Sequence, residues 1–332
     1  MGPEEAADWM ARTRTTTLLV RVAGATVLEL DRPEAGDGAY AIDGTTHLEA
    51  TGELPSLCLP FQVLDDGRMR HDVASAQKSV AALLAAVAAD RGLLDFDDPV
   101  TTHLGPGWSR APVEHERAVT VRHLMSMTSG LDDLLEPVAA PGEVWRYGLG
   151  PTWHLVKRVV TAAAGLDLQE VTDTWLGRPL GLTDTVWVDR PGMSYLDGRP
   201  FEALSTTGRD LAAIGGLVLA GGAGIVSGER LAELLRPSQE LNPAYGLLWW
   251  LNGRTPIRMP MVDEPIDRVL LPHAPADTVA MLGALGQLCH VTPSLGVVVV
   301  RLGSTTGGLG GMTGSTLADD LWRDVLVPMG IG

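Results

Sequence analysis

The chain has 332 residues, of which 45% are hydrophobic, which is enough for a sizeable core in one or two domains. Its net charge of −16 at pH 7 argues against nucleic acid and anionic membrane as main partners, because both are negatively charged themselves. The two cysteines, Cys58 and Cys289, have no metal-ligand spacing and form no disulfide framework. We interpret each as a small buried hydrophobic residue.

No segment of the sequence resembles a targeting or membrane-spanning element. The N-terminus is acidic and is not followed by the apolar segment of a secretory signal peptide. An uncharged apolar stretch, residues 211–228, is rich in glycine and too short to span a bilayer. We therefore expect a cytoplasmic protein with a small molecule, and no membrane or nucleic acid, as its partner.

The first half of the chain predicts a hairpin followed by helices. Residues 16–22 and 26–30 are typical of two strands that turn at residues 23–25. Residues 31–72 are rich in turn formers and hold either further short strands or a loop over a site. Helical patterns then begin at Ser75, after a cap at Thr120, and over a segment that ends at Gly165.

The second half predicts two more helices, which start at residues 207–210 and 227–230, and then strands at 286–291 and 296–302. The valine run within 296–302 is typical of a central strand that is covered on both faces. Residues 317–327 predict a closing helix.

Strands at both ends with helices between them indicate an α+β fold, in which the two chain ends share one antiparallel sheet flanked by helices and the middle forms an inserted helical lobe. We expect a sheet domain of residues 1–72 plus 205–332, a mainly helical domain of residues 73–204, and the active site between them.

Lysine is scarce, and this draws attention to Lys78. The chain has 25 basic residues besides histidine, but only Lys78 and Lys157 are lysines. A guanidinium keeps its proton in proteins, whereas a buried ammonium can lose it and act as a base. Ser75 lies three residues before Lys78, on the same side of a helix, and residues 80–89 are apolar enough to predict that this helix is buried. The simpler alternative is a serine that starts a helix and a solvated lysine.

Five segments, in this order and spacing, resemble the serine β-lactamase and penicillin-binding-protein superfamily. The resemblance is closest to its class C-like branch, which includes family VIII carboxylesterases and nylon-oligomer hydrolases, and it extends from about residue 70 to the C-terminus. The segments are residues 70–79, 92–100, 119–131, 141–147 and 283–287. The resemblance implies the β-lactamase/DD-peptidase-like fold and no cofactor or metal.

The same resemblance implies roles for individual residues. Ser75 would be the nucleophile, Lys78 the base that takes its proton, and Tyr147 the relay to the leaving group. The backbone amides of Ser75 and Ala284 would form the oxyanion hole, in which preorganised donors stabilise the developing charge. Leu149, Gly283 and Leu285 would contact the substrate.

Two departures from the family pattern bear on the substrate. The family's Tyr-x-Asn element reads Tyr147-Gly148-Leu149 here, and its Lys-Thr-Gly element is replaced by Leu282-Gly283-Ala284. The missing cation helps to hold the β-lactam carboxylate in members that handle penicillins. We therefore favour a small ester or amide with an apolar acyl group over a β-lactam or a DD-peptidase substrate, with transfer of the acyl group to another nucleophile also open.

A different class of function remains as the alternative. The chain could be a catalytically silent relative that binds a ligand in the same cleft. The presence of Ser75, Lys78 and Tyr147 together, in a chain poor in lysine and tyrosine, favours an enzyme.

Overall fold

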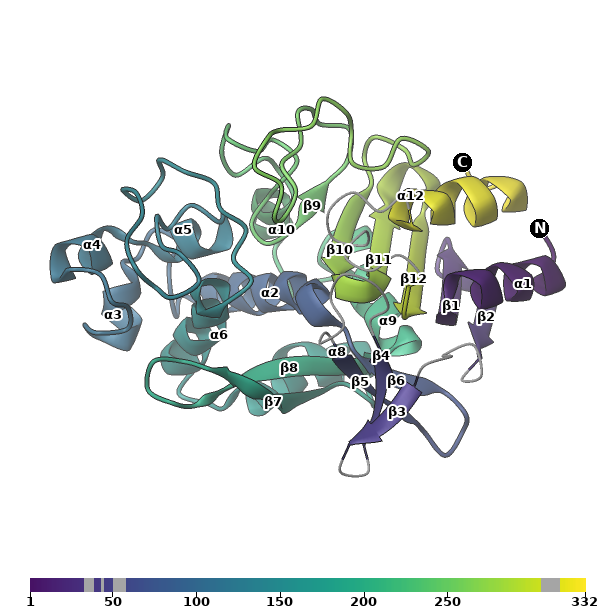
Figure 1. Ribbon diagram of the computed structural model, residues 1–332, viewed down its shortest axis with the longest axis horizontal. Coiled ribbons are helices and arrows are strands. Elements are labelled where there is room, and N and C mark those ends of the chain that lie inside the picture. Colours follow the sequence, from purple (N-terminus) through teal and green to yellow (C-terminus); the bar gives the residue numbers. More distant parts are fainter. Residues whose placement is uncertain (33–38, 43–44, 50–57, 306–316) are drawn as a thin grey trace.

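The computed structural model describes residues 1–32, 39–42, 45–49, 58–305 and 317–332, which form two six-stranded antiparallel sheets and the helices around them (Figure 1). The strands are β1 Thr15–Val22, β2 Ala25–Asp31, β3 Ala39–Ile42, β4 Thr45–Glu49, β5 Cys58–Val63, β6 Met69–Asp72, β7 Val186–Ser194, β8 Pro200–Thr207, β9 Trp250–Leu251, β10 Val279–Gly283, β11 Gln287–Thr292 and β12 Val297–Gly303.

The longer helices are α1 Pro3–Thr13, α2 Gln77–Asp90, α6 Pro151–Ala164 and α9 Gly208–Leu219. The shorter helices and helical turns are η2 Ala74–Ala76, α3 Val100–Leu104, α4 Val113–Ala118, α5 Val121–Met125, α7 Leu168–Thr172, η3 Asp173–Gly177, α8 Arg178–Leu180, α10 Gly228–Leu234, η4 Ala284–Gly286, η5 Pro293–Leu295, α12 Leu317–Leu321, η6 Trp322–Leu326 and η7 Val327–Met329.

The first sheet joins the two ends of the chain in the order β2-β1-β12-β11-β10-β9. β1 pairs with β12 in register, with Val20 opposite Val299, and also forms the predicted hairpin with β2. The predicted α+β class and the antiparallel sheet shared by both ends are therefore confirmed.

The two faces of this sheet are covered by different helices. Leu18, Val20 and Val299 pack against α1 and the C-terminal helices, which lie side by side near the two termini (Figure 1). Leu19 and Val300 point into the main core on the other face, where α9 crosses β12. This double cover explains the continuous valine run in β12.

The second sheet has the order β3-β4-β5-β6-β8-β7. The described parts of residues 31–72 thus contribute short strands, while residues 33–38, 43–44 and 50–57 lie outside the described residues. β7 and β8 form a hairpin that lies largely inside a segment that we predicted to be mainly helical. β6 pairs with β8, with His71 opposite Thr206, so this sheet crosses the expected boundaries near residues 72 and 205. The division into two domains stays a prediction.

Helix ends follow the predicted capping signals. The side chains of Thr120, Thr207 and Ser227 each accept a hydrogen bond from a backbone N–H in the first turn of α5, α9 and α10. Gly165 ends α6 in the left-handed conformation. The predicted closing helix begins at Leu317 as α12 and continues through η6 and η7.

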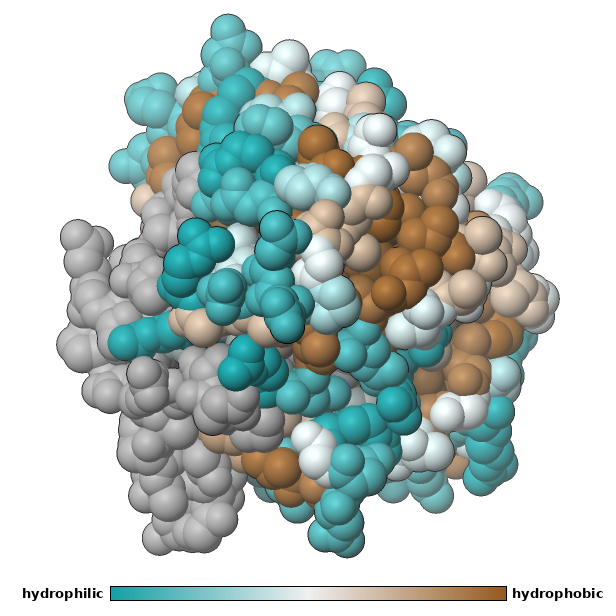
Figure 2. All heavy atoms as spheres, turned by 90° about the vertical axis from the view of Figure 1, so that its right-hand side faces the viewer, coloured by the Kyte–Doolittle hydropathy of each residue, from teal (hydrophilic) through white to brown (hydrophobic). Residues whose placement is uncertain are grey.

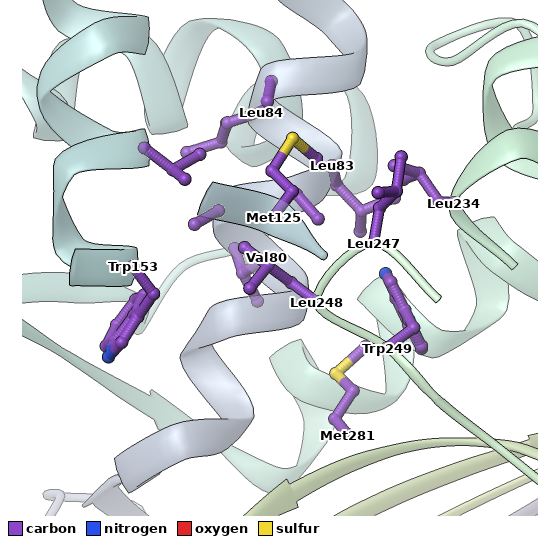
Figure 3. Close-up of a cluster of buried hydrophobic side chains, with 14 of the residues drawn as sticks. Val80, Leu83, Leu84, Met125, Trp153, Leu234, Leu247, Leu248, Trp249 and Met281 are labelled. Atoms are coloured by element: carbon purple, nitrogen blue, oxygen red, sulfur yellow. The ribbon is translucent and has the colours of Figure 1, made fainter. Parts of the chain in front are cut away.

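The core surrounds α2, whose residues from Gln77 to Ala89 are all buried. Figure 3 shows Val80, Leu83 and Leu84 of this helix among Met125, Trp153 and side chains from residues 234–281. The Ser79 hydroxyl donates a hydrogen bond of 2.8 Å to the Leu248 carbonyl, so one polar contact also fixes the helix within the core. The start of α2, where the site lies, is thus held rigidly.

The surface is mixed in character. On the face that carries both chain termini, an apolar patch lies beside larger hydrophilic areas (Figure 2). Among the described residues, no helix has the length and hydropathy that a membrane crossing requires.

Candidate active site

Ser75 lies in the short turn η2, between the end of β6 and the start of α2. Ala74 has a positive φ of 48°, a conformation that non-glycine residues rarely adopt. The Asp72 carboxylate stabilises this turn by accepting a hydrogen bond of 2.8 Å from the Ala74 N–H. Ser75 is partly exposed, whereas the residues on either side of it are buried. The side chain of Ser75 is therefore accessible from solvent at this turn.

Lys78 contacts Ser75 directly. Its Nζ lies 2.8 Å from the Ser75 Oγ, and the lysine is only 2% exposed. Burial lowers the pKa of Lys78 well below its usual value, the charge of Arg190 lowers it further, and the carboxylate of Asp133 partly opposes both effects. A neutral amine within hydrogen-bond distance of a serine hydroxyl can accept its proton.

The ring of Tyr147 lies next to the Lys78 amine. The Lys78 Nζ is 4.4 Å from the centre of the Tyr147 ring, which also stacks on Trp250 with 5.7 Å between ring centres. Burial raises the pKa of Tyr147 to about 12, although hydrogen bonding to Ser75 and Trp250 works in the opposite direction. The phenol therefore keeps its proton at neutral pH and can donate it to a leaving group.

The end of β10 approaches the serine turn closely. A Cβ on Gly283 would lie only 2.3 Å from the Val73 carbonyl oxygen and 3.2 Å from the Ala76 nitrogen, so only glycine fits there. Ala284 follows in the turn η4, which the buried guanidinium of Arg301 stabilises. The Arg301 Nη1 donates hydrogen bonds to the carbonyl oxygens of residues 285 and 286 at 2.8 Å and 2.9 Å.

These elements enclose one pocket of about 290 Å³, part of it open to solvent. Four predicted site residues meet in its wall, namely Ser75, Tyr147, Gly283 and Ala284, and four others line it that we did not predict, namely Trp250, Met259, Pro260 and Leu282. None of these eight residues carries a charged side chain.

Leu149 and Leu285 are not among the residues that line this pocket. Leu149 is half-buried against the core, and its N–H donates a hydrogen bond of 3.0 Å to Asp133. Leu285 is 2% exposed and has a φ of 59°, at the bend of η4. Their predicted contact with substrate stays a prediction.

Sequence reasoning missed the charged groups around Lys78. Asp133, Arg190 and Lys157 all influence the pKa of Lys78. The scarcity of lysine could have pointed to Lys157, whereas nothing in the sequence singles out the other two. Among the residues that the structure describes, no group of three His, Cys, Asp or Glu side chains is placed to hold a metal ion.

The family model described as Beta-lactamase matches residues 64–320, which are most of the chain. Monacolin J acid methylbutanoyltransferase from Aspergillus terreus is 29% identical over 192 residues, which are 45% of this chain and 44% of that protein. Esterase EstB from Burkholderia gladioli is 29% identical over 174 residues, which are 40% of this chain and 44% of that protein. The matched regions thus span less than half of the length of these two curated relatives.

A solved structure extends the likeness to the whole fold. EstCE1, described as a hydrolase with promiscuous acyltransferase activity, superimposes with a TM-score of 0.66 at 16% identity, over 97% of this chain and 96% of that one. A putative β-lactamase from Bacteroides dorei also superimposes with a TM-score of 0.66 at 18% identity, over 96% of this chain and 95% of that one. This match confirms the predicted β-lactamase/DD-peptidase-like fold.

Proposed function

Since the chain belongs to the Beta-lactamase family, a family of hydrolases, we propose that it is a serine hydrolase that forms an acyl-enzyme on Ser75. The observation that carries the proposal is the 2.8 Å contact between the Ser75 Oγ and the buried amine of Lys78. The esterase and acyltransferase relatives support acyl chemistry without specifying the substrate.

The acylation step would use the geometry of the pocket as follows. Lys78 takes the Ser75 proton while the Oγ attacks the carbonyl carbon of an ester or amide. The negative charge on the carbonyl oxygen would be stabilised by the backbone amides of Ser75 and Ala284, which need no reorganisation as the charge develops. Tyr147 would give its proton to the departing alcohol or amine as the bond between the carbonyl carbon and that group breaks. The proton that Lys78 took from Ser75 would then pass to Tyr147, so that the phenol and the neutral amine are both restored.

Deacylation would reverse these roles. A water molecule gives a proton to the base and attacks the acyl carbon, and Ser75 leaves with its proton restored. An alcohol or amine in place of water would make the same step an acyl transfer. The methylbutanoyltransferase from Aspergillus terreus and EstCE1 are both described as acyl-transferring enzymes, and we propose that either acceptor can react here.

The pocket wall favours an uncharged, apolar acyl group. Trp250, Met259, Pro260 and Leu282 supply apolar surface, and none of the described residues that line the pocket is a cation that could pair with a substrate carboxylate. We therefore expect small apolar esters or amides to react faster than penicillins or cell-wall peptides.

Hydrolysis of p-nitrophenyl butyrate by the wild type, Ser75→Ala, Lys78→Ala and Lys78→Arg tests the proposal. We expect activity in the wild type and a loss of at least about a thousandfold in kcat in each variant, because nucleophile and base act as a unit. Lys78→Arg keeps the charge but removes the titratable amine. Full activity in Ser75→Ala would overturn the catalytic assignment. No activity in any of the proteins, with bound ligands found by screening, would favour the silent relative.

A further inference from the structure

Both lysines of the chain are buried and lie against the same indole ring. The Nζ of Lys78 is 4.6 Å, and the Nζ of Lys157 5.3 Å, from the centre of the Trp153 ring. Both lysines are 2% exposed. Because both amines lie near one ring, they are no more than about 10 Å apart, a distance at which unit charges still interact inside a protein.

Several groups around Lys78 favour its charged form. The faces of Tyr147 and Trp153 attract an ammonium through cation–π interactions. The carboxylate of Asp133 acts in the same direction. A base that must take the Ser75 proton has to overcome these influences, and burial is one of the forces that does so.

Two cations oppose them, and each is anchored by its own carboxylate. Lys157 lies 3.2 Å from the Glu202 Oε2 and also donates to the backbone carbonyl of the same residue. Arg190 of β7 forms an ion pair with Asp72, which is 1% exposed. The influence of each cation on the pKa of Lys78 is coulombic.

We propose that Lys157 is a positioning residue for the reaction, and that its positive charge near pH 7, together with that of Arg190, keeps Lys78 in the amine form that accepts the Ser75 proton. This inference rests on the proposed function, because the charge state of Lys78 matters for chemistry only if Ser75 is the nucleophile. Lys157 would touch neither substrate nor the reacting atoms.

The other groups that face Lys157 do not replace its charge. Glu202 on β8 and Asp72 on β6 are acidic, and Trp187 on β7 offers only a ring face, 5.0 Å from the Lys157 Nζ. His154, its neighbour on α6, is buried, and its pKa is well below the usual value because of burial and then the charges of Lys157, Lys78 and Arg190. His154 is therefore neutral near pH 7.

The expected size of the effect follows from the separation of the two amines. At about 10 Å and an effective dielectric constant of about 20 to 40, one unit charge shifts the pKa of the other group by about 0.5 to 1 unit. A shift of half a unit changes the ratio of ammonium to amine about threefold.

Nuclear magnetic resonance can measure this shift directly because the chain has so few lysines. Protein grown with lysine labelled at the ε-carbon gives two signals in the wild type and one, that of Lys78, in Lys157→Gln and in Lys157→Arg. We expect the pKa of Lys78 to rise by at least about 0.5 unit in Lys157→Gln and to stay within about 0.2 unit of wild type in Lys157→Arg, which keeps the charge.

Arg190→Gln gives a second and independent variant should Lys157→Gln fail to fold, and it should shift the pKa of Lys78 in the same direction. The acidic limb of the pH profile of kcat/KM should move with the measured pKa in every variant. A Lys78 that titrates at the same pH in wild type and in both Gln variants, or that stays neutral in all of them across the stable range, would overturn the inference.

The same experiment separates the inference from the proposed function. If the Lys78 signal shifts as expected but no protein hydrolyses any ester, the charge coupling is real and the proposed hydrolase is wrong. If hydrolysis depends on Ser75 while the Lys78 signal does not shift, the hydrolase stands and Lys157 has no such role.

Discussion

Gly283→Ala is the most discriminating single change for the proposed oxyanion hole. Gly283 has φ −122° and ψ 155°, which alanine adopts without strain, so the substitution probes packing alone. Its new methyl group would lie 2.3 Å from the Val73 carbonyl oxygen and 3.0 Å from the Gln287 Cβ. Ordinary contacts begin near about 3.4 Å, so β10 must withdraw from the serine turn by about 1 Å.

This displacement would fall on the amide of the next residue, Ala284. A misplacement of about 1 Å at a reacting centre costs about a hundredfold in rate, and loss of an oxyanion-hole donor costs about 10² to 10³. We therefore expect kcat/KM for p-nitrophenyl butyrate to fall about a hundredfold in Gly283→Ala, with most of the loss in kcat.

Two glycines of α9 provide matched controls. A Cβ on Gly216 would meet no atom within 4 Å, whereas one on Gly215 would lie 2.7 Å from Val298 Cγ1, and neither Gly215 nor Val298 lines the pocket. Gly216→Ala should behave as wild type, and Gly215→Ala should melt at a lower temperature with normal kcat/KM. A kcat/KM of Gly283→Ala within about threefold of wild type would mean that the close approach of β10 does not position the Ala284 amide. The same conclusion would follow if kcat/KM fell as far in Gly215→Ala as in Gly283→Ala.

Three further changes test other parts of the structure. Trp250→Ala should enlarge the pocket and raise the ratio of kcat/KM for octanoate over butyrate esters, and an unchanged ratio would argue that the acyl group binds elsewhere. Arg301→Met removes the donor to two buried carbonyls of η4 and should lower the free energy of unfolding by at least about 3 kcal/mol in urea titrations, against no change if the turn holds itself. Burial lowers the pKa of Lys157 from 10.5 to about 8. Between these values the unfolded chain binds a proton that the folded chain lacks, so stability rises with pH. In urea titrations between pH 8 and pH 9, the free energy of unfolding should rise less steeply with pH in Lys157→Gln than in wild type, by up to about 1.4 kcal/mol per pH unit. Equal slopes in the two proteins would contradict the lowered pKa of Lys157.

The sequence predicts those parts of the fold that depend on local patterns. The hairpin β1–β2, the buried helix α2 and the capped helices follow from periodicity and capping residues that lie next to one another in the chain. The Ser75–Lys78 contact follows from a spacing of three residues within a helical turn. Local signals also mark the start of helix α1, which has a proline at its first position and Glu4 and Glu5 in its first turn, although we did not predict this helix from the sequence.

The second sheet and the pocket wall depend on contacts between distant residues. β6 pairs with β8 across more than a hundred residues, and no local pattern reports such a pairing. Met259 and Pro260 reach the pocket from the segment between β9 and β10, which has little regular structure to predict. A tryptophan such as Trp250 is predicted to be a core residue because its side chain is large and aromatic. In the structure its ring packs on Tyr245, and the same residue also lines the pocket.

The choice of lysine at two positions gains a physical meaning from the structure. The basic groups of the described ion pairs on the surface are mainly arginines, such as Arg122 with Asp97 and Arg323 with Asp324, and these pairs need a charge that is always present. The two lysines are both buried against Trp153, and burial lowers the pKa of each amine. The proposed role of Lys157 uses only its charged form, so arginine should replace this lysine without loss. At Lys78 arginine should abolish acylation, because the amine form itself is the reagent.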